Sequence, residues 1–284
     1  MKPYEILDSG DFKKLERVGK FTIIRPSLNS PYPIADSSLW RQADAEYTRD
    51  TGGGKWIFHR EMPGEFVLPW ERDFRFKIKF TPFGHLGIFP EQEENWKILD
   101  EIGKKKKNLK ILNLFAYSGV STVYAAGSGM EVCHVDASRG MVEWARENAR
   151  YSNLESAKIR WIVDDVQKFL KREIKRNKKY DGVILDPPSF GRGTKGEVWK
   201  IETDLIPLLE LLKPLLKKEP EFIILSCHTT GYSPLILERV LRNCFPNSGE
   251  YAHRELKLRE KTGQFCSGGF CSYLYDKSLK DIVQ

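Results

Sequence analysis

The chain has 284 residues, of which 40% are hydrophobic and 30% charged. This apolar content is enough for a packed core and excludes wholesale disorder, and the length favours one large domain or one domain with an appendage. No stretch approaches the roughly 18 apolar residues of a membrane span, and the first residues lack the apolar run of a signal peptide, so we expect a soluble, cytoplasmic protein. The formal net charge of +7 modestly favours an anionic partner such as nucleic acid.

Cysteines and lysines give weaker signals. The five cysteines are odd in number and form no C-x-x-C pair, which predicts free thiols with neither a zinc site nor a disulfide framework. Positive charge gathers at residues 104–107 and between 168 and 179. The first cluster is interpreted as a solvated linker and the second as the solvent-exposed face and end of a helix.

The region from residue 1 to 90 is predicted to be small and mainly β. Residues 21–24 form a short apolar segment, and residues 74–80 alternate aromatic or aliphatic side chains with Arg and Lys. That alternation is typical of a half-buried strand. A turn is expected at 83–87, followed by a helix over 91–102.

From residue 91 to 284 the pattern changes to alternating strands and helices, which predicts a doubly wound, mainly parallel α/β sheet. Two late strands, over 251–258 and 269–275, leave no room for a full helix between them and predict an antiparallel final pair. The earlier strands are expected over 110–115, 131–135, 159–163, 181–185 and 221–226, and the helices over 118–126, 138–151, 166–176 and 198–212.

The end of the first of these strands is a candidate ligand site, because open parallel sheets bind ligands beyond the carboxyl ends of their strands. Asn113 to Gly119 leads from strand to helix. A glycine here lets a ligand approach the backbone, and the helix start presents unpaired N–H groups. An ordinary tight turn explains the same residues. The single glycine departs from G-x-G-x-x-G, which argues against a dinucleotide.

Carboxylates follow the next two strands. Asp136 lies seventeen positions after Gly119, where a carboxylate can accept hydrogen bonds from ribose hydroxyls. Asp165 can receive an adenine amino group. Each also has a structural alternative: Asp136 as a residue at a helix start, and Asp165 as a helix N-cap.

The segment Asp186-Pro-Pro-Ser-Phe190 is the most specific feature. Two prolines after a buried strand stiffen the turn, and they fix the Asp186 carboxylate and nearby carbonyls as acceptors for a planar base. Phe190 can stack on that base. A purely structural corner is the alternative. Residues 191–196 are predicted to be a mobile cationic loop that meets phosphate through Arg192 and Lys195.

In this order and spacing, the motifs resemble class I S-adenosylmethionine-dependent RNA methyltransferases. The resemblance is strongest to the bacterial branch of large-subunit ribosomal RNA cytosine-5 and guanine methyltransferases, and covers about 83–275. It implies a Rossmann-like sheet of seven strands with the last pair antiparallel, S-adenosylmethionine as cofactor, RNA as partner, and closure of residues 87–92 over the cofactor. The implied cofactor residues are Phe89, Gln92, Asn113, Phe115, Tyr117, Gly119, Asp136, Asp165 and Asp186, and the implied substrate residues are Pro187, Pro188, Phe190, Arg192 and Lys195.

Two departures from the cytosine-5 members leave the substrate open. There is no space for an extra RNA-binding module before Phe21, and Ser189 stands where those members carry lysine. A protein or small-molecule methyltransferase, or a non-catalytic RNA- or cofactor-binding module, are the competing interpretations.

Cys227, at the end of the fifth strand, decides between two reaction routes. In the cytosine-5 branch a cysteine here is the nucleophile: its thiolate adds to the ring, the 5-carbon takes the methyl group, and Asp186 steadies the ring nitrogen. The alternative is a buried thiol that acts as a small hydrophobe. Methyl transfer would then go directly to a nitrogen held by Asp186.

Overall fold

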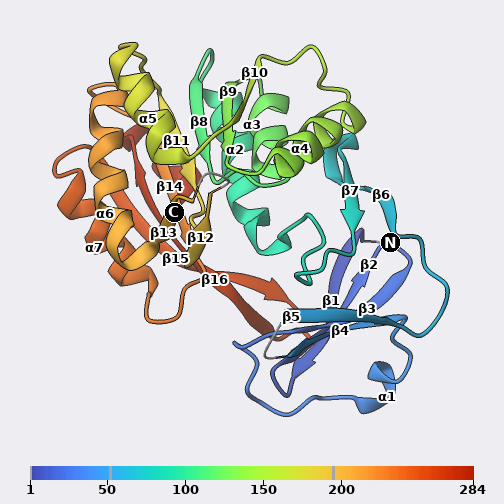
Figure 1. Cartoon of the computed structure of the whole chain (residues 1–284). Coiled ribbons are helices and arrows are strands. Elements are labelled where there is room, and N and C mark those ends of the chain that lie inside the picture. Colours follow the sequence, from blue (N-terminus) through green and yellow to red (C-terminus); the bar gives the residue numbers. More distant parts are fainter. Residues whose placement is uncertain (1, 51–52, 194–195) are drawn as a thin grey trace. The chain divides into compact units, whose positions relative to one another are not determined.

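The computed structural model describes residues 2–50, 53–193 and 196–284. The chain forms two compact units. The first comprises Met1–Glu91 with Lys257–Gly268, and the second comprises Gln92–Leu256 with Gly269–Gln284. Figure 1 shows the elements of both.

The first unit is built on a five-stranded sheet in sequential order, β1-β2-β3-β4-β5. Its neighbours pair antiparallel, except β3 and β4, which run parallel. The expected mainly-β character is confirmed. The described elements are β1 (Tyr4–Gly10), β2 (Lys13–Val18), β3 (Phe21–Pro26), α1 (Ser37–Trp40), β4 (Ala45–Asp50), β5 (Gly53–Phe58), the ribbon of β6 (Glu65–Pro69) and β7 (Arg75–Lys79), and the 3-10 turn η1 (Glu71–Asp73).

Strands β1 and β2 were missed from sequence, because charged residues interrupt their apolar ones. Glu16 shows how the fold accommodates one such charge. Its side chain is fully buried and receives two hydrogen bonds from Arg25, of 2.6 Å from Nε and 2.7 Å from Nη2. The pair satisfies both charges inside the unit.

A distant piece of chain completes the first unit. Leu258 and Cys266 pack against Ile6 and Tyr4, and the backbone N–H of Lys261 donates to the carbonyl of Ile6 at 2.8 Å. These residues come from the adjoining ends of β15 and β16 and from the turn between them. From the sequence we expect residues 91–284 to form one domain, whereas 257–268 belong to the first unit.

The second unit contains a seven-stranded sheet in the order β10-β9-β8-β11-β14-β16-β15. The first five strands run parallel, and β16 runs antiparallel to β14. The predicted seven-stranded sheet with a final antiparallel pair is confirmed. Its strands are β8 (Lys110–Leu114), β9 (Glu131–Asp136), β10 (Ile159–Val163), β11 (Gly182–Leu185), β14 (Phe222–Cys227), β15 (Glu250–Arg259) and β16 (Phe265–Tyr275).

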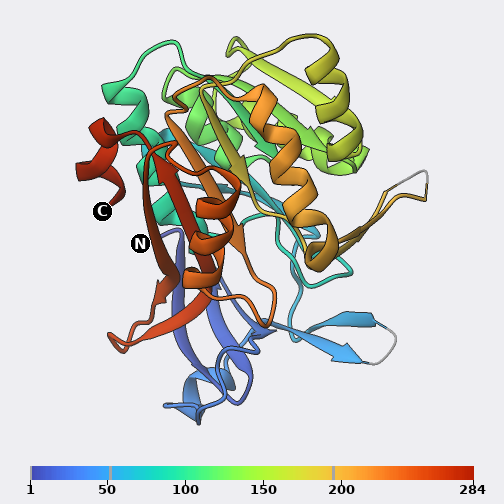
Figure 2. The ribbon, with the colours of Figure 1, turned by 90° about the vertical axis from the view of Figure 1, so that its left-hand side faces the viewer.

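Helices cover both faces of this sheet, as Figures 1 and 2 show. One face packs against α5, α6 and α7, and the other against α2, α3, α4 and α8, so each face has its own apolar core. No helix in the described part of the chain is long and apolar enough to cross a membrane. The helices are α2 (Glu93–Lys105), α3 (Val120–Gly127), α4 (Arg139–Tyr151), α5 (Val166–Lys175), α6 (Ile201–Leu212), α7 (Pro234–Cys244) and α8 (Lys280–Val283), with short 3-10 turns η2 (Pro90–Gln92), η3 (Lys213–Leu215) and η4 (Lys277–Leu279).

The segment after the double proline differs from its prediction. Residues 198–200 are strand β13 (Val198–Lys200), not the start of a helix, and they pair with β12 (Phe190–Arg192) in a small ribbon. Trp199 anchors the ribbon, since its Nε1 donates to the Pro188 carbonyl at 2.7 Å and its ring packs on Phe115. The first two residues of the expected loop, 191 and 192, are therefore strand, and helix α6 begins only at Ile201.

Candidate active site

Strands β8 and β11 are neighbours in the sheet, and the strand order reverses between them. Ligands of open α/β sheets bind at such a switch point, outside the carboxyl ends of the strands. The segment from Asn113 to Gly119 and the segment from Asp186 to Phe190 both leave the sheet at this edge.

The turn between β8 and α3 is strained. Phe115, Tyr117 and Gly119 have φ angles of +54°, +50° and +78°. The left-handed region costs an L-residue roughly 1–2 kcal/mol, and such strain persists where the surroundings enforce it, often at functional sites. A Cβ on Gly119 would lie 2.6 Å from the Cβ of Ala145 on α4. The turn therefore packs directly against α4.

Asp136 ties this turn to the end of β9. Its Oδ2 accepts a hydrogen bond from the N–H of Tyr117 at 2.9 Å, and its Oδ1 accepts one from the N–H of Ser138 at 2.8 Å. Burial raises the pKa of its carboxyl group. Since a carboxylate has about four acceptor positions, two remain for ribose hydroxyls. The structural role of Asp136 and its predicted binding role are thus compatible.

The side chains of Asn113 and Asp165 form hydrogen bonds within the second unit. Asn113 is 3% exposed, and its Nδ2 donates to Thr122 Oγ1 at 2.9 Å, which in turn contacts His134 Nδ1 at 2.9 Å. Asp165 is the N-cap of α5 and accepts from the N–H of Lys168 at 2.9 Å. The N-cap alternative is confirmed, and the adenine contact of Asp165 stays a prediction.

Asp186 is held on one side by a buried amide. Gln92 Nε2 donates to Asp186 Oδ2 at 3.4 Å. The Oε1 of Gln92 accepts from Asn95 Nδ2 at 2.6 Å and from Ser226 Oγ at 3.2 Å, which fixes the direction of the amide. Asp186 Oδ1 is buried and accepts no hydrogen bond from any described residue. One oxygen therefore anchors the side chain and the other is left for a ligand.

His228 faces that second oxygen, and sequence reasoning did not select it. Its Nε2 lies 3.4 Å from Asp186 Oδ1, and its side chain is 37% exposed. Gly269 packs against the ring, since a Cβ there would lie 2.5 Å from His228 Nδ1. A histidine directly after Cys227, at the end of β14, was the available signal.

The double proline is tied to the end of β14. Pro187 is buried and Pro188 exposed. Ser189 Oγ contacts Thr229 Oγ1 at 2.7 Å, which links the two strand ends. Phe190 is 51% exposed, and the Arg192 guanidinium lies over its ring, with the guanidinium carbon 5.8 Å from the ring centre. The remaining predicted substrate residue, Lys195, lies outside the described residues.

Cys227 is 0% exposed and belongs to the apolar core beneath the strand ends. Burial raises the pKa of its thiol, and the negative charge of Asp186 adds to the effect. The N–H of Thr229 contacts its Sγ at 3.4 Å and opposes the shift only in part. A nucleophilic cysteine needs cationic or strongly donating surroundings that lower its pKa, and Cys227 has the reverse.

Phe89 lies in the first unit, where its ring is 5.4 Å from that of His85. Its closure over the cofactor stays a prediction. Gln92, from the same predicted segment, belongs to the second unit and reaches Asp186 as described.

A family model described as S-adenosylmethionine-dependent methyltransferase matches residues 53–230. The chain belongs to this family. S-adenosylmethionine is therefore its cofactor, and the residues at the switch point fit that group. Asp136, at the end of β9, offers two further acceptor positions for ribose hydroxyls.

Relatives of this methyltransferase chain agree with the family. The crystal structure of the SAM-dependent methyltransferase from Agrobacterium tumefaciens is 34% identical, with a TM-score of 0.92 over 97% of this chain and 91% of that one. Ribosomal RNA large subunit methyltransferase K/L of Shewanella frigidimarina is 31% identical over 55% of this chain and 22% of its own length. Ribosomal RNA large subunit methyltransferase I of Tolumonas auensis is 26% identical over 84% of this chain and 58% of its own length. The chain thus spans less than two thirds of these curated relatives.

Proposed function

We propose that the chain methylates a base in RNA, with bacterial large-subunit ribosomal RNA as the substrate and the cytoplasm as the compartment. The names of the two curated relatives support this, as does the net charge of +7. The observation that carries the proposal is the acceptor Asp186 Oδ1, which has no hydrogen-bond donor among the described residues and lies at the switch point of the sheet, where open α/β sheets bind ligands.

The geometry favours direct transfer to a nitrogen of the base. S-adenosylmethionine supplies a methyl group on a sulfonium, which needs no activation beyond correct placement. Asp186 Oδ1 accepts a hydrogen bond from the target N–H and directs the nitrogen lone pair. His228 Nε2 takes the proton that the nitrogen loses as its new bond to carbon forms and the sulfur–carbon bond breaks. Phe190 stacks on the base, which must first be unstacked from the RNA.

The covalent route to cytosine has less support. It requires a Cys227 thiolate that reaches the ring, whereas this thiol is in the core with a raised pKa. Ser189, where cytosine-5 members carry lysine, points the same way.

The test is transfer of a labelled methyl group to an unmodified transcript of large-subunit ribosomal RNA, with mass mapping of the modified nucleoside. We expect label on a base nitrogen. We expect Asp186→Asn to lower the rate by about a hundredfold, as loss of one site electrostatic contact typically does, while cofactor affinity changes only a few-fold. Asp281→Asn, an exposed change on α8, is the matched control.

Three results would count against the proposal. Cofactor binding without labelling of any RNA removes the substrate. Labelling of a peptide or metabolite instead selects the other enzyme class. RNA binding that responds neither to cofactor nor to Asp186→Asn indicates a non-catalytic module.

A further inference from the structure

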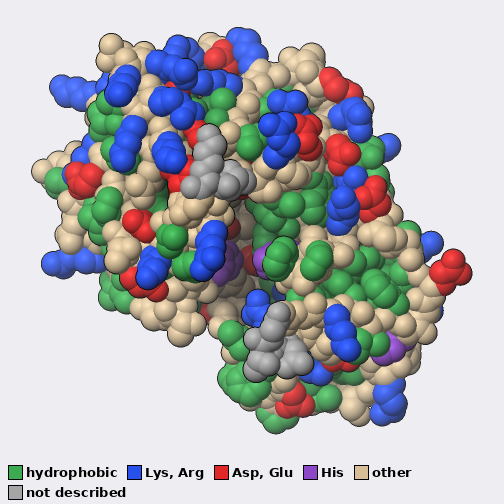
Figure 3. All heavy atoms as spheres, in the orientation of Figure 1, with side chains coloured by type: hydrophobic (Ala, Val, Ile, Leu, Met, Phe, Trp, Pro, Cys, Tyr) green, Lys and Arg blue, Asp and Glu red, His purple; other side chains and the backbone are tan. Residues whose placement is uncertain are grey.

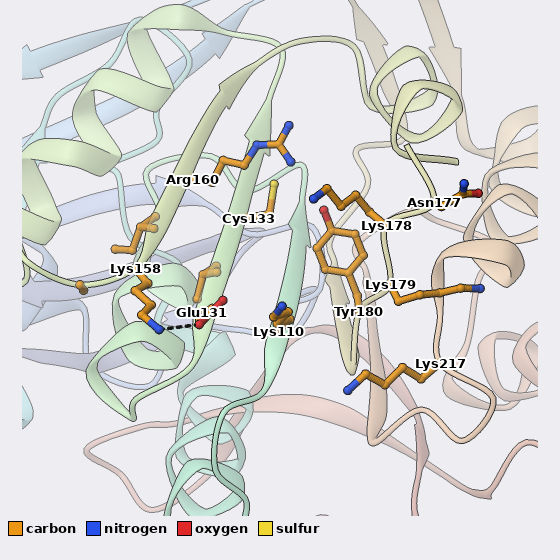
Figure 4. A pocket seen from close by; sticks show the side chains of 13 residues that line it. Lys110, Glu131, Cys133, Lys158, Arg160, Asn177, Lys178, Lys179, Tyr180 and Lys217 are labelled. Carbon is orange, nitrogen blue, oxygen red and sulfur yellow. Dashed lines mark hydrogen bonds and ion pairs between the residues drawn. The ribbon is translucent and has the colours of Figure 1, made fainter. Parts of the chain in front are cut away.

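A pocket of the second unit lies at the edge of the sheet where the parallel strands begin, opposite the candidate active site. It has a volume of about 650 Å³ and is shown in Figure 4. Its walls are the first residues of β8, β9 and β10 and the two loops that follow α5 and η3. The lining residues are Lys110, Glu131, Val132, Cys133, Ala157, Lys158, Ile159, Arg160, Asn177, Lys178, Lys179, Tyr180 and Lys217.

Positive charge dominates this groove. The lining contains one carboxylate, Glu131. Two more carboxylates form ion pairs with cations of the lining: Glu173 with Arg160, and Asp181 with Lys217. Six cations against three carboxylates leave a net charge of +3. The cations are Lys110, Lys158, Arg160, Lys178, Lys179 and Lys217.

Arg160 is held in a fixed position. Its Nη1 and Nη2 donate to the two oxygens of Glu173 at 2.9 and 3.1 Å. Glu173 is fully buried and is fixed in turn by the Tyr180 hydroxyl at 2.6 Å and Arg176 at 3.0 Å. A guanidinium has five N–H donors, so three remain for a ligand on a preorganised cation.

Lys110 and Lys178 add further positive charge to the lining. Both are exposed, and neither side chain forms a hydrogen bond or ion pair with another described residue. In Figure 4 the ends of Lys178 and Arg160 point toward the same space above Cys133. Lys178 and the rigid Arg160 can thus contact one anionic group, and Lys110 adds a further cation to the lining.

Helix α5 connects this groove with the methyl-transfer edge. It begins at Val166, three residues after the end of β10, and the loop that follows its last residue, Lys175, lines the groove. Its ten residues span about 15 Å, close to the length of about 16 Å of a five-residue strand. Cations gather over α5 in Figure 3. The cations on the exposed surface of α5 and at its end are Lys168, Lys171, Arg172, Lys175 and Arg176.

We propose that the groove, together with this face of α5, binds the phosphodiester backbone of the RNA whose base is methylated at the opposite edge. The inference rests on the proposed function for its substrate. Phosphate fits because the surface carries an excess of one charge and fixed N–H donors. A protein partner fits less well, since Tyr180, the aromatic residue of the lining, is buried and offers no exposed anchor.

The test measures binding of the full chain to an unmodified large-subunit ribosomal RNA transcript between 50 and 200 mM salt. Lys110→Glu/Lys178→Glu is compared with wild type and with Lys280→Glu, an exposed change on α8 away from the groove. Each lost phosphate contact lowers the slope of log affinity against log salt by about 1. The loss of affinity across this salt range should therefore shrink about tenfold in the double variant and stay unchanged in Lys280→Glu.

Cofactor affinity, measured by calorimetry with S-adenosylhomocysteine, serves as the check on folding and should match wild type. If the double variant keeps the wild-type salt slope while wild type methylates the RNA, the groove proposal falls and the proposed function stands. If the slope changes but no RNA is methylated, the groove stands and the proposed function falls. The proposal would also be overturned if polyglutamate binds the wild-type groove while the salt dependence of RNA binding is the same in wild type and the double variant, because the groove would then fit an acidic protein partner.

Discussion

The two oxygens of Asp186 have different environments. Oδ2 accepts from Gln92, whose amide is fixed by Asn95 and Ser226, while Oδ1 is turned toward His228. A carboxylate held in this way needs little reorganisation when a base arrives, which is what preorganised electrostatic stabilisation requires.

Cys227 offers the sharpest test at this scale. We expect Cys227→Ala to retain methyl transfer to RNA within a few-fold, because a buried thiol with a raised pKa is not available as a nucleophile. Loss of the Sγ atom from the core should cost about 1 kcal/mol of unfolding free energy. Labelled transfer and urea unfolding measure the two effects. Cys133→Ala, which removes another buried thiol, is the control.

Abolished turnover in Cys227→Ala, with Cys133→Ala still active, would restore the covalent route to cytosine.

Residue types at the strand ends could be predicted from sequence, but their contacts could not. The acidic residues at the ends of β9 and β11 stand out, because open α/β sheets bind ligands beyond the carboxyl ends of their strands. The split environment of Asp186 depends on Gln92, 94 positions earlier, and on Ser226, 40 positions later. No local pattern contains that information.

At the scale of elements, the β8–α3 turn determines the site. Its three left-handed residues turn the chain sharply enough for Gly119 to lie against Ala145. The turn was expected from a single glycine, whereas the aromatic residues in the same backbone conformation were not. Aromatic side chains seldom adopt it, so propensity gives no warning.

We expect Gly119→Ala to weaken binding of S-adenosylhomocysteine by tenfold or more, since the new Cβ must displace either α4 or the turn. Gly129→Ala is a matched control. Its φ of +86° imposes the same backbone strain, but nothing lies within 4 Å of the new Cβ. It should cost about 1–2 kcal/mol of stability and leave cofactor affinity unchanged. Calorimetry on both variants checks this, and equal losses of affinity would show that the clash is irrelevant.

The β12–β13 ribbon shows where prediction from local pattern failed. Val198 and Trp199 favour strand, but the helical pattern that continues to Leu212 masked them. Trp199 joins the ribbon to Phe115 and Pro188, two contacts that exist only in the folded unit.

At the scale of the whole molecule, each unit has its own core, and the alternation of strands and helices was sufficient to predict the larger one. The smaller one depends in part on Glu16 and Arg25. Burial alone would raise the pKa of Glu16, but Arg25 and Lys14 outweigh it and lower that pKa to about 2.

We expect the buried pair of Glu16 and Arg25 to make the folded state less stable in acid. A carboxyl group with a depressed pKa stabilises the folded state above its ordinary pKa of about 4.5, and the stabilisation is lost as pH falls toward 2. We expect Glu16→Gln to flatten this pH dependence and to cost about 3–5 kcal/mol at pH 7, because Arg25 is left buried without its counter-charge. Urea unfolding at pH 7, 4.5 and 3 measures both effects.

Glu46→Gln provides the comparison, since it removes an ion pair of 2.7 Å with the half-exposed Lys13. Such a pair is worth under about 1 kcal/mol. A loss at Glu16 no larger than that at Glu46 would contradict the role given to the buried pair.

The packing of Ile6 against the adjoining ends of β15 and β16 has a consequence for biosynthesis. Ile6 is translated long before its partners Leu258 and Cys266. The five-stranded sheet therefore remains without part of its core until those partners have left the ribosome, while most strands of the larger sheet are already available to fold. A nascent chain stalled before residue 257 would expose the apolar surface that Leu258 and Cys266 cover, and a fragment cut at residue 91 would expose it permanently.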